Sequence, residues 1–292
     1  MVGLPRSAER PVKSYRTRRI ADAVGVTWSF LCAFLAAAVL LIILGYIVVK
    51  GATAINWQFL TQLPHPVGVE GGGVANGIVG SMITVGIAVL IASPIGIMTG
   101  LYLALFSRGG FASTVRFLSD VLSGIPSITI GLFAYALLVA PFKHFSALSA
   151  SFAFAVLMLP LLVRTSEEAI RSVPRAILEG ALALGMTTFR STLRIVLPVA
   201  WPSIVTGLLL AIARVAGETA PLLFTAFGSP FWELNPTNPM AVLSLQVFTY
   251  AISPYRSQNV QAWGAALLLV VAVLALNLLA RVLLRTRIRA AP

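Results

Sequence analysis

The sequence predicts an all-α integral membrane protein with six transmembrane helices and with both chain ends on the cytoplasmic side. Its 292 residues are 58% hydrophobic and only 10% charged, and the mean hydropathy is +0.93. Such values are typical of integral membrane proteins. The apolar residues gather in runs that match the length of a bilayer-crossing helix, about 20 residues.

Six apolar runs are predicted to span the membrane. They cover residues 26–49, 74–106, 121–140, 147–163, 199–227 and 262–284. The second run is too long for one straight crossing, and Pro94 is expected to kink it. The stretch 241–252 is too short to span, so we expect a re-entrant or interfacial segment within the outer loop 228–261. The first run exceeds the core of a signal peptide, about 7–15 residues, and is expected to stay as an anchor.

The distribution of basic residues tests this topology independently, because Lys and Arg in short loops accumulate on the cytoplasmic side. Seventeen of the 21 basic residues fall in segments predicted to be cytoplasmic, among them the N-terminal segment 1–25 and the loop 164–198. The remaining four are Lys50, Lys143 and Arg256 in outer loops and Arg214 within a span. Topology therefore explains the net charge of +12, and no nucleic-acid partner is expected.

Cysteine and histidine are too few for a stapled or metal-binding protein. The chain has one cysteine, Cys32, and two histidines, His65 and His144. A disulfide within the chain and a Cys/His metal site are therefore excluded.

The most informative segment is the predicted cytoplasmic loop 164–198. Ser172 is expected to cap a helix that has Pro174 in its first turn and runs to Leu184. Gly185 is placed to end this helix in the left-handed conformation, and one of the two threonines after Met186 then caps a second helix. We therefore expect two short helices joined at a glycine.

The first of these helices has an apolar side. Its residues are Ile177, Leu178, Ala181 and Leu182. The helix either rests on its own membrane domain or docks on a partner protein. Small residues at 180, 181 and 183 favour the second reading, because they let another surface approach the backbone closely.

A charged pair interrupts the fifth predicted span. Arg214 and Glu218 are four residues apart near the bilayer midplane, where a charge costs at least about 2.5 kcal/mol and must face protein or water. They form an internal ion pair on one helix face, or they belong to a substrate path. Pro221 favours the path, because it has no N–H for the carbonyl of Gly217 and leaves polar backbone beside the hydroxyl of Thr219.

The chemistry of the pair indicates an anion. The guanidinium of Arg214 presents a fork of N–H donors that matches oxyanions, phosphate included. We expect Glu218 to neutralise Arg214 between passages of the substrate. A proton-coupled secondary transporter, in which Glu218 carries the proton, is the alternative.

Other polar residues in the apolar runs are weaker candidates. Ser123 and Ser127, beside Gly124 and Pro126 in the third span, present hydroxyls to the same path or serve only in helix packing, which we favour. Asn76 is expected to cap the second span.

The predicted cytoplasmic loop resembles the EAA loop of ABC importer permeases. Glu179-Gly180-Ala181, three residues, Gly185, nine residues, Ile195, one residue and Leu197-Pro198 repeat its spacing, with Gly180 in place of alanine. The resemblance implies the type I ABC importer permease fold and a MetI-like permease domain over residues 70–284. It also implies a coupling helix that docks on a separate ATPase. Its residues are Glu179, Gly180, Ala181, Leu182, Gly185 and Met186.

The chain has no G-x-x-x-x-G-K-[ST] phosphate-binding loop of its own. It is therefore expected to bind no cofactor and not to be an enzyme, with ATP hydrolysed by the partner ATPase.

Three segments resemble the PstA subfamily of phosphate importer permeases: residues 71–106, 122–132 and 214–226. The resemblance implies a multi-pass protein of the bacterial cell membrane that pairs with a PstC-like permease above two PstB-like ATPases. A PstS-like binding protein would deliver inorganic phosphate, and membrane lipid would surround the spans. The EAA loop alone does not separate phosphate from other oxyanions such as sulfate or molybdate.

Overall fold

The computed structural model describes residues 15–288 except 67, 70 and 107–108. The basic residues Arg6, Arg10, Lys13, Arg108 and Arg289 lie outside the described residues. Two compact units are present, residues 1–49 and 50–292. The first holds most of α1 (Tyr15–Ala52), which includes the first predicted span.

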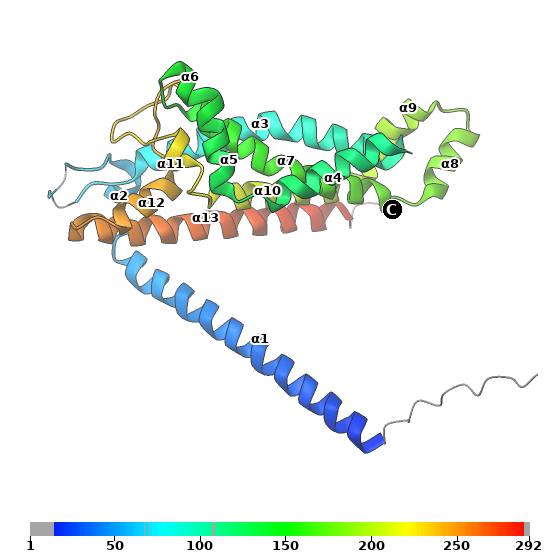
Figure 1. Cartoon of the computed structure of the whole chain (residues 1–292), viewed down its shortest axis with the longest axis horizontal. Helices are drawn as coiled ribbons and strands as arrows, with labels where there is room; N and C mark the ends of the chain where they lie inside the picture. Colours follow the sequence, from blue (N-terminus) through cyan, green and yellow to red (C-terminus); the bar gives the residue numbers. More distant parts are fainter. Residues whose placement is uncertain (1–14, 67, 70, 107–108, 289–292) are drawn as a thin grey trace, which may run out of the picture. The chain divides into compact units, whose positions relative to one another are not determined.

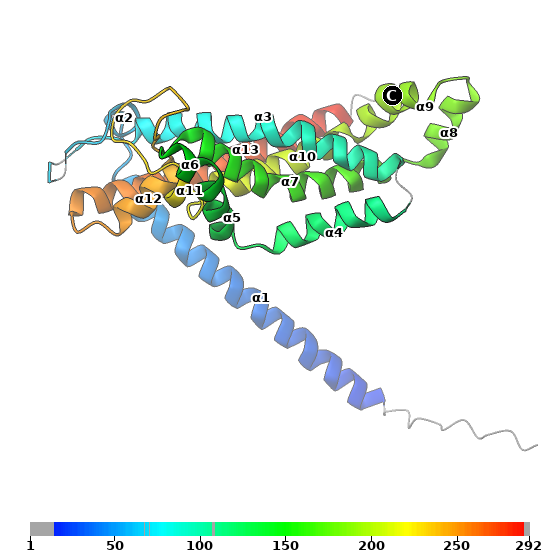
Figure 2. The same cartoon turned by 45° about the horizontal axis from the view of Figure 1, so that its top comes forward.

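The second unit is a bundle of helices (Figures 1 and 2). Along the chain it contains α2 (Trp57–Thr61), α3 (Ala75–Leu105), α4 (Gly110–Gly124), α5 (Ser127–Ala134), the π-helical turn η1 (Tyr135–Val139), α6 (Ala140–Phe142), α7 (Ala147–Arg171), α8 (Arg175–Ala183), α9 (Thr188–Ser191), the π-helical turn η2 (Thr192–Val196), α10 (Leu197–Ala216), α11 (Leu222–Thr225), α12 (Leu243–Ala251) and α13 (Arg256–Ile288). In both views α3, α7, α10 and α13 run side by side, and α8 and α9 lie at one end of the bundle.

Small residues let the central helices pack closely. Helix α7 is the most buried of the long helices, with 67% of its apolar window inside the described chain. A Cβ added to Gly96 of α3 would lie 2.6 Å from the Cβ of Leu162, and one added to Gly100 would lie 2.6 Å from the Cβ of Ser166. Close backbone approach of this kind is typical of helix pairs in membranes.

The described chain contains five helices that are long and apolar enough to cross a membrane, and a bent pair that makes a sixth span if it is counted as one. The pair joins α4 to the segment 127–142 at an angle of 102°. The predicted third span, 121–140, is therefore not one helix. The reason is Pro126, which disfavours the α conformation at Ile125, where φ is −72° and ψ is 131°.

Two further boundaries differ from the predictions. The fifth span, expected over 199–227, ends as a helix at Ala216. Helix α7 continues to Arg171, so Ser172 is the C-cap of α7 and not the N-cap of the next helix. Pro94 lies inside the continuous helix α3.

A buried ion-pair cluster explains why α7 continues past the apolar run. Glu167 is only 3% exposed, and its Oε1 accepts from the Nε of Arg116 and from Arg171, each at 2.7 Å. Arg116 also donates to the carbonyl of Leu103 at 3.0 Å. Through Arg116 the cluster connects α4 with Glu167 of α7 and with the carbonyl of Leu103 near the end of α3.

We expect Glu167→Ala to destabilise the protein by about 1–3 kcal/mol, because the partly buried Arg116 would lose its carboxylate partner, whereas Arg171 is 53% exposed and stays hydrated. Thermal unfolding of the purified protein in detergent measures the change. Asp120→Asn is the control, because it breaks the exposed Asp120–Arg164 pair and should have a much smaller effect. An unfolding curve of Glu167→Ala that matches wild type would contradict the assignment.

Candidate functional site

The predicted two-helix loop is present at one end of the bundle. Helix α8 ends at Ala183, and Gly185 has the left-handed φ of +82°. Thr187 then caps α9, its side chain accepting from the N–H of Arg190 at 3.4 Å. These parts of the local prediction are confirmed.

The predicted coupling residues divide between two faces of this loop. Ala181 is buried against the rest of the chain, and Met186 is half-buried. The others are exposed: Glu179, Gly180, Leu182 and Gly185. Two large apolar side chains also project here, with Leu184 86% and Phe189 69% exposed. Apolar side chains this exposed at the tip of a loop are typical of a surface that a partner covers.

Gly180 and Gly185 make a matched pair for testing the local geometry. Gly180→Ala should stabilise α8 by up to about 1 kcal/mol, because a Cβ there meets no atom within 4 Å. Gly185→Ala should destabilise the loop by about 1 kcal/mol, because its φ is left-handed. Hydrogen exchange of the α8 amides is the measurement. Equal protection in the two variants would contradict this geometry.

Arg214 lies in the last turn of α10, on an exposed stripe of that helix. The stripe consists of Ser203, Thr206, Leu210 and Arg214. The buried face of α10 carries Ile204, Gly207, Ala211 and Val215 instead. A cation in the last turn of a helix also gains about 0.3–1 kcal/mol from the helix dipole. The guanidinium therefore points away from the core of this chain.

The expected helical pairing of Arg214 with Glu218 is not formed. Glu218 lies beyond the end of α10, and its N–H donates to the carbonyl of Val215 at 3.1 Å. Within the described residues no ion pair joins the two side chains. Gly217 and Pro221 explain this difference, because glycine weakens the helix and proline cannot continue its hydrogen bonding. Arg214 is exposed and Glu218 is half-buried.

The non-helical segment 217–221 is held by the short helix α12. The hydroxyl of Thr219 donates to the carbonyl of Ser244 at 3.3 Å. The hydroxyl of Ser244 donates to the carbonyl of Glu218 at 2.9 Å. Sequence reasoning missed Ser244, because one small polar residue in an apolar stretch carries no signal of its own.

The two candidate serines have different surroundings. Ser127 and Gly131 are one turn apart on α5, and a Cβ added to Gly131 would lie 2.5 Å from the Cα of Pro221. Ser127 thus lies on the helix face that packs on the break at 217–221. The hydroxyl of Ser123 instead donates to the carbonyl of Ser119 within α4, at 2.9 Å. The structure brings only Ser127 towards the break.

Asn76 is not a helix cap, because α3 has Val74 as its N-cap. It is buried, and its amide joins distant segments. Its Oδ1 accepts from Gln246 at 3.0 Å, and its Nδ2 donates to the carbonyl of Ser229 at 2.8 Å. Asn76 therefore connects α3 with α12 and with the preceding loop.

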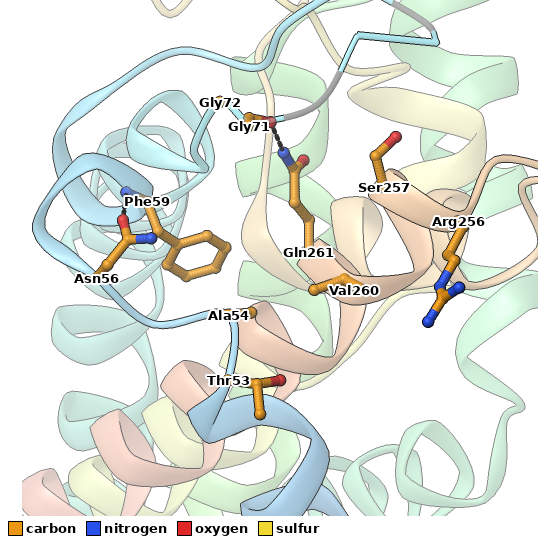
Figure 3. A pocket seen from close by; sticks show the side chains of 10 residues that line it. All are labelled: Thr53, Ala54, Asn56, Phe59, Gly71, Gly72, Arg256, Ser257, Val260 and Gln261. Atoms are coloured by element: carbon orange, nitrogen blue, oxygen red, sulfur yellow. Dashed lines mark hydrogen bonds between the residues drawn. The ribbon is translucent and has the colours of Figure 1, made fainter.

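Two of the hollows in the described part of the chain lie away from Arg214. Figure 3 shows a cavity of about 290 Å³ lined by Thr53, Phe59, Arg256, Ser257 and Gln261 among others, where Gln261 donates to the carbonyl of Gly71. A groove of about 610 Å³ lies beneath α8 and includes Glu179 and Leu182. Only the groove contains predicted site residues, and it extends the surface of the predicted coupling loop.

Comparison with known proteins gives one consistent family. The family described as "Binding-protein-dependent transport system inner membrane component" matches residues 92–287. The phosphate transport system permease protein PstA of Yersinia pestis is 42% identical over 81% of this chain and 80% of its own length. PstA of Xylella fastidiosa strain Temecula1 is 41% identical over 92% of this chain and 94% of its own length.

Solved structures support the same fold. A chain of the MetNI methionine ABC transporter, in an inward-facing conformation, aligns with a TM-score of 0.62 at 18% identity, over 73% of this chain and 95% of that chain. A chain of a bacterial ABC transporter for alginate import aligns with a TM-score of 0.60 at 15% identity, over 92% of this chain and 99% of that chain.

The predicted ABC importer permease fold and the multi-pass inner-membrane location are thus confirmed, and the relatives are permease subunits, not enzymes. The chain belongs to the family of binding-protein-dependent transport system inner membrane components, and within it to the PstA phosphate transport system permeases.

Proposed function

We propose that this chain forms half of the membrane path of an ATP-driven importer of inorganic phosphate. The observation that carries the proposal is Arg214, an exposed cation on an otherwise apolar span, with no ion pair among the described residues. The cost of a charge at membrane depth requires that this face meet water or another protein, not lipid. The names of the relatives indicate phosphate as the anion.

Arg214 binds the anion, and Glu218 pairs with Arg214 when the anion is absent. The guanidinium offers two parallel N–H donors to the oxygens of phosphate, a geometry that a lysine does not provide. Glu218 approaches Arg214 after the anion has left, so that the cation does not stay unpaired. In this structure the two are apart, which leaves the guanidinium available. Ser127 adds a hydroxyl near the same break, whereas the hydroxyl of Thr219 is engaged with the carbonyl of Ser244.

The rest of the importer is supplied by partner chains. A PstC-like permease covers the exposed stripe of α10 and completes the path. Two PstB-like ATPases bind ATP, and one of them receives α8 through the exposed Glu179, Gly180 and Leu184. A PstS-like binding protein delivers phosphate at the opposite end of the bundle. Support for this arrangement comes from the family description and from neighbours that are ABC transporters.

Competition among oxyanions tests the choice of substrate. Reconstituted complex is given labelled phosphate together with a hundredfold excess of unlabelled sulfate or molybdate. We expect phosphate uptake to persist and only unlabelled phosphate to compete. Strong inhibition by sulfate or molybdate would favour the related oxyanion permeases instead.

A further inference from the structure

The segment between α10 and α11 lacks part of the helical hydrogen bonding that its neighbours have. In a continuous helix, the carbonyl of Glu218 would accept from the N–H of Leu222. That N–H instead donates to the carbonyl of Thr219 at 3.0 Å. An unsatisfied carbonyl within a membrane costs several kcal/mol, so another donor is required.

Ser244 supplies that donor. Its hydroxyl lies 2.9 Å from the carbonyl oxygen of Glu218, and its own carbonyl accepts from the hydroxyl of Thr219 at 3.3 Å. We call these two reciprocal hydrogen bonds the latch. Ser244 is only 2% exposed, so water has little access to the Ser244 side of these bonds, whereas Glu218 and Thr219 are half-buried.

The start of α12 is itself fixed on α3. The N–H of Leu243 donates to the hydroxyl of Ser81 at 2.8 Å, and Gln246 donates to Asn76 at 3.0 Å. Close packing reinforces these bonds, because a Cβ added to Gly80 would overlap the carbonyl of Ala241. Ser244 thus lies between a fixed helix on one side and the backbone of Glu218 on the other.

We infer that Ser244 is a positioning residue of the anion path. Through the latch it sets the backbone of Glu218 relative to Arg214, and it connects the outer segment α12 with the site. A shift of α12 on α3 would therefore move Glu218 and change how far it neutralises Arg214. This inference rests on the proposed function, and it adds a residue and a link between the outer side and the site.

The test measures the ratio of phosphate imported to ATP hydrolysed by the full complex in proteoliposomes. This ratio is insensitive to the amount of correctly folded complex, which a merely structural role would change. Ser244→Ala and Thr219→Val each remove one bond of the latch. We expect the ratio to fall by about tenfold in each, and the double variant to fall no further than the worse single variant, because both belong to one unit.

Two matched variants complete the experiment. Thr219→Ser keeps the hydroxyl that donates to the carbonyl of Ser244. Because this hydrogen bond is retained, the ratio should stay within about twofold of the wild-type value. Thr249→Val removes a hydroxyl of α12 whose bonds among the described residues stay within its own helix, to the carbonyls of Leu245 and Gln246, and it should leave the ratio unchanged. If the complex with Ser244→Ala fails to assemble, the ratio measured for Thr219→Val tests the latch instead. Thr219 is half-buried and valine has the same shape, so this variant is expected to assemble.

The outcomes separate the two proposals. A wild-type ratio in Thr219→Val and Ser244→Ala, with wild-type complex importing phosphate, would overturn the role of the latch and leave the proposed function intact. A wild-type complex that hydrolyses ATP without importing phosphate would overturn the proposed function, and this inference with it.

Discussion

Arg214→Ala is expected to lower phosphate uptake by about 100-fold or more, because it removes two charge-assisted hydrogen bonds to the anion. Arg214 lies on the exposed stripe of α10, so the truncation leaves no cavity in the core of this chain. The loss should therefore appear in transport and not in the amount of assembled complex. Uptake of labelled phosphate by proteoliposomes, normalised to complex, is the measurement.

Three variants make this result specific. Arg214→Lys keeps the charge but loses the fork of donors, and should fall between wild type and alanine. Glu218→Gln should change the rate or produce a leak, because the resting partner of Arg214 is then neutral. Arg256→Gln removes an exposed arginine that lines the separate cavity of Figure 3 and should transport normally. Normal uptake by Arg214→Ala would refute the anion site.

Glu179→Lys combined with Gly185→Trp is expected to abolish uptake while membrane insertion stays intact. Both residues are exposed on the two-helix loop. The first change reverses a charge on α8, and the second forces a large side chain into the left-handed φ of +82° at the loop tip. Docking of the ATPase should fail, because a contact surface tolerates neither a reversed charge nor protruding bulk. Co-purification of the ATPase subunit measures this directly.

A control for this double variant combines a charge reversal and a glycine-to-tryptophan change at described residues outside the two-helix loop. Lys143→Glu reverses an exposed charge, and Gly68→Trp places the same side chain at an open glycine with φ of +88°. This pair should retain the ATPase. If Glu179→Lys with Gly185→Trp also retains it and transports normally, the coupling assignment of α8 is wrong.

The features that depend on neighbouring residues in the sequence can be predicted from the sequence alone. Apolar runs predicted the long helices, since bilayer-length hydrophobic segments need no partner to be recognised. The left-handed conformation that the sequence predicts for Gly185 after α8 is confirmed, because glycine is the residue that ends helices in this conformation. The EAA spacing and the segment beginning at Arg214 indicated the family that the comparisons show.

The features that depend on residues far apart in the sequence cannot be predicted in this way. Helix α7 continues to Arg171 because Glu167 meets Arg116, which is 51 residues away in the sequence. The end of α10 at Ala216 is tolerated because Ser244 satisfies the carbonyl of Glu218 from 26 residues away. The i, i+4 spacing of Arg214 and Glu218 predicts a helical pair, but Gly217 between them and Pro221 after them end the helix at Ala216. Long-range hydrogen bonds thus decide where these helices end.

The central claim is that ATP, hydrolysed by a partner, drives phosphate through a path lined by this chain. Its most direct test is uptake of labelled phosphate by the reconstituted complex, with ATP supplied to the α8 side and with the proton gradient present or collapsed. We expect uptake to require ATP and to continue without the gradient. Uptake driven by the gradient alone, without ATP, would contradict the account and favour a proton-coupled secondary transporter.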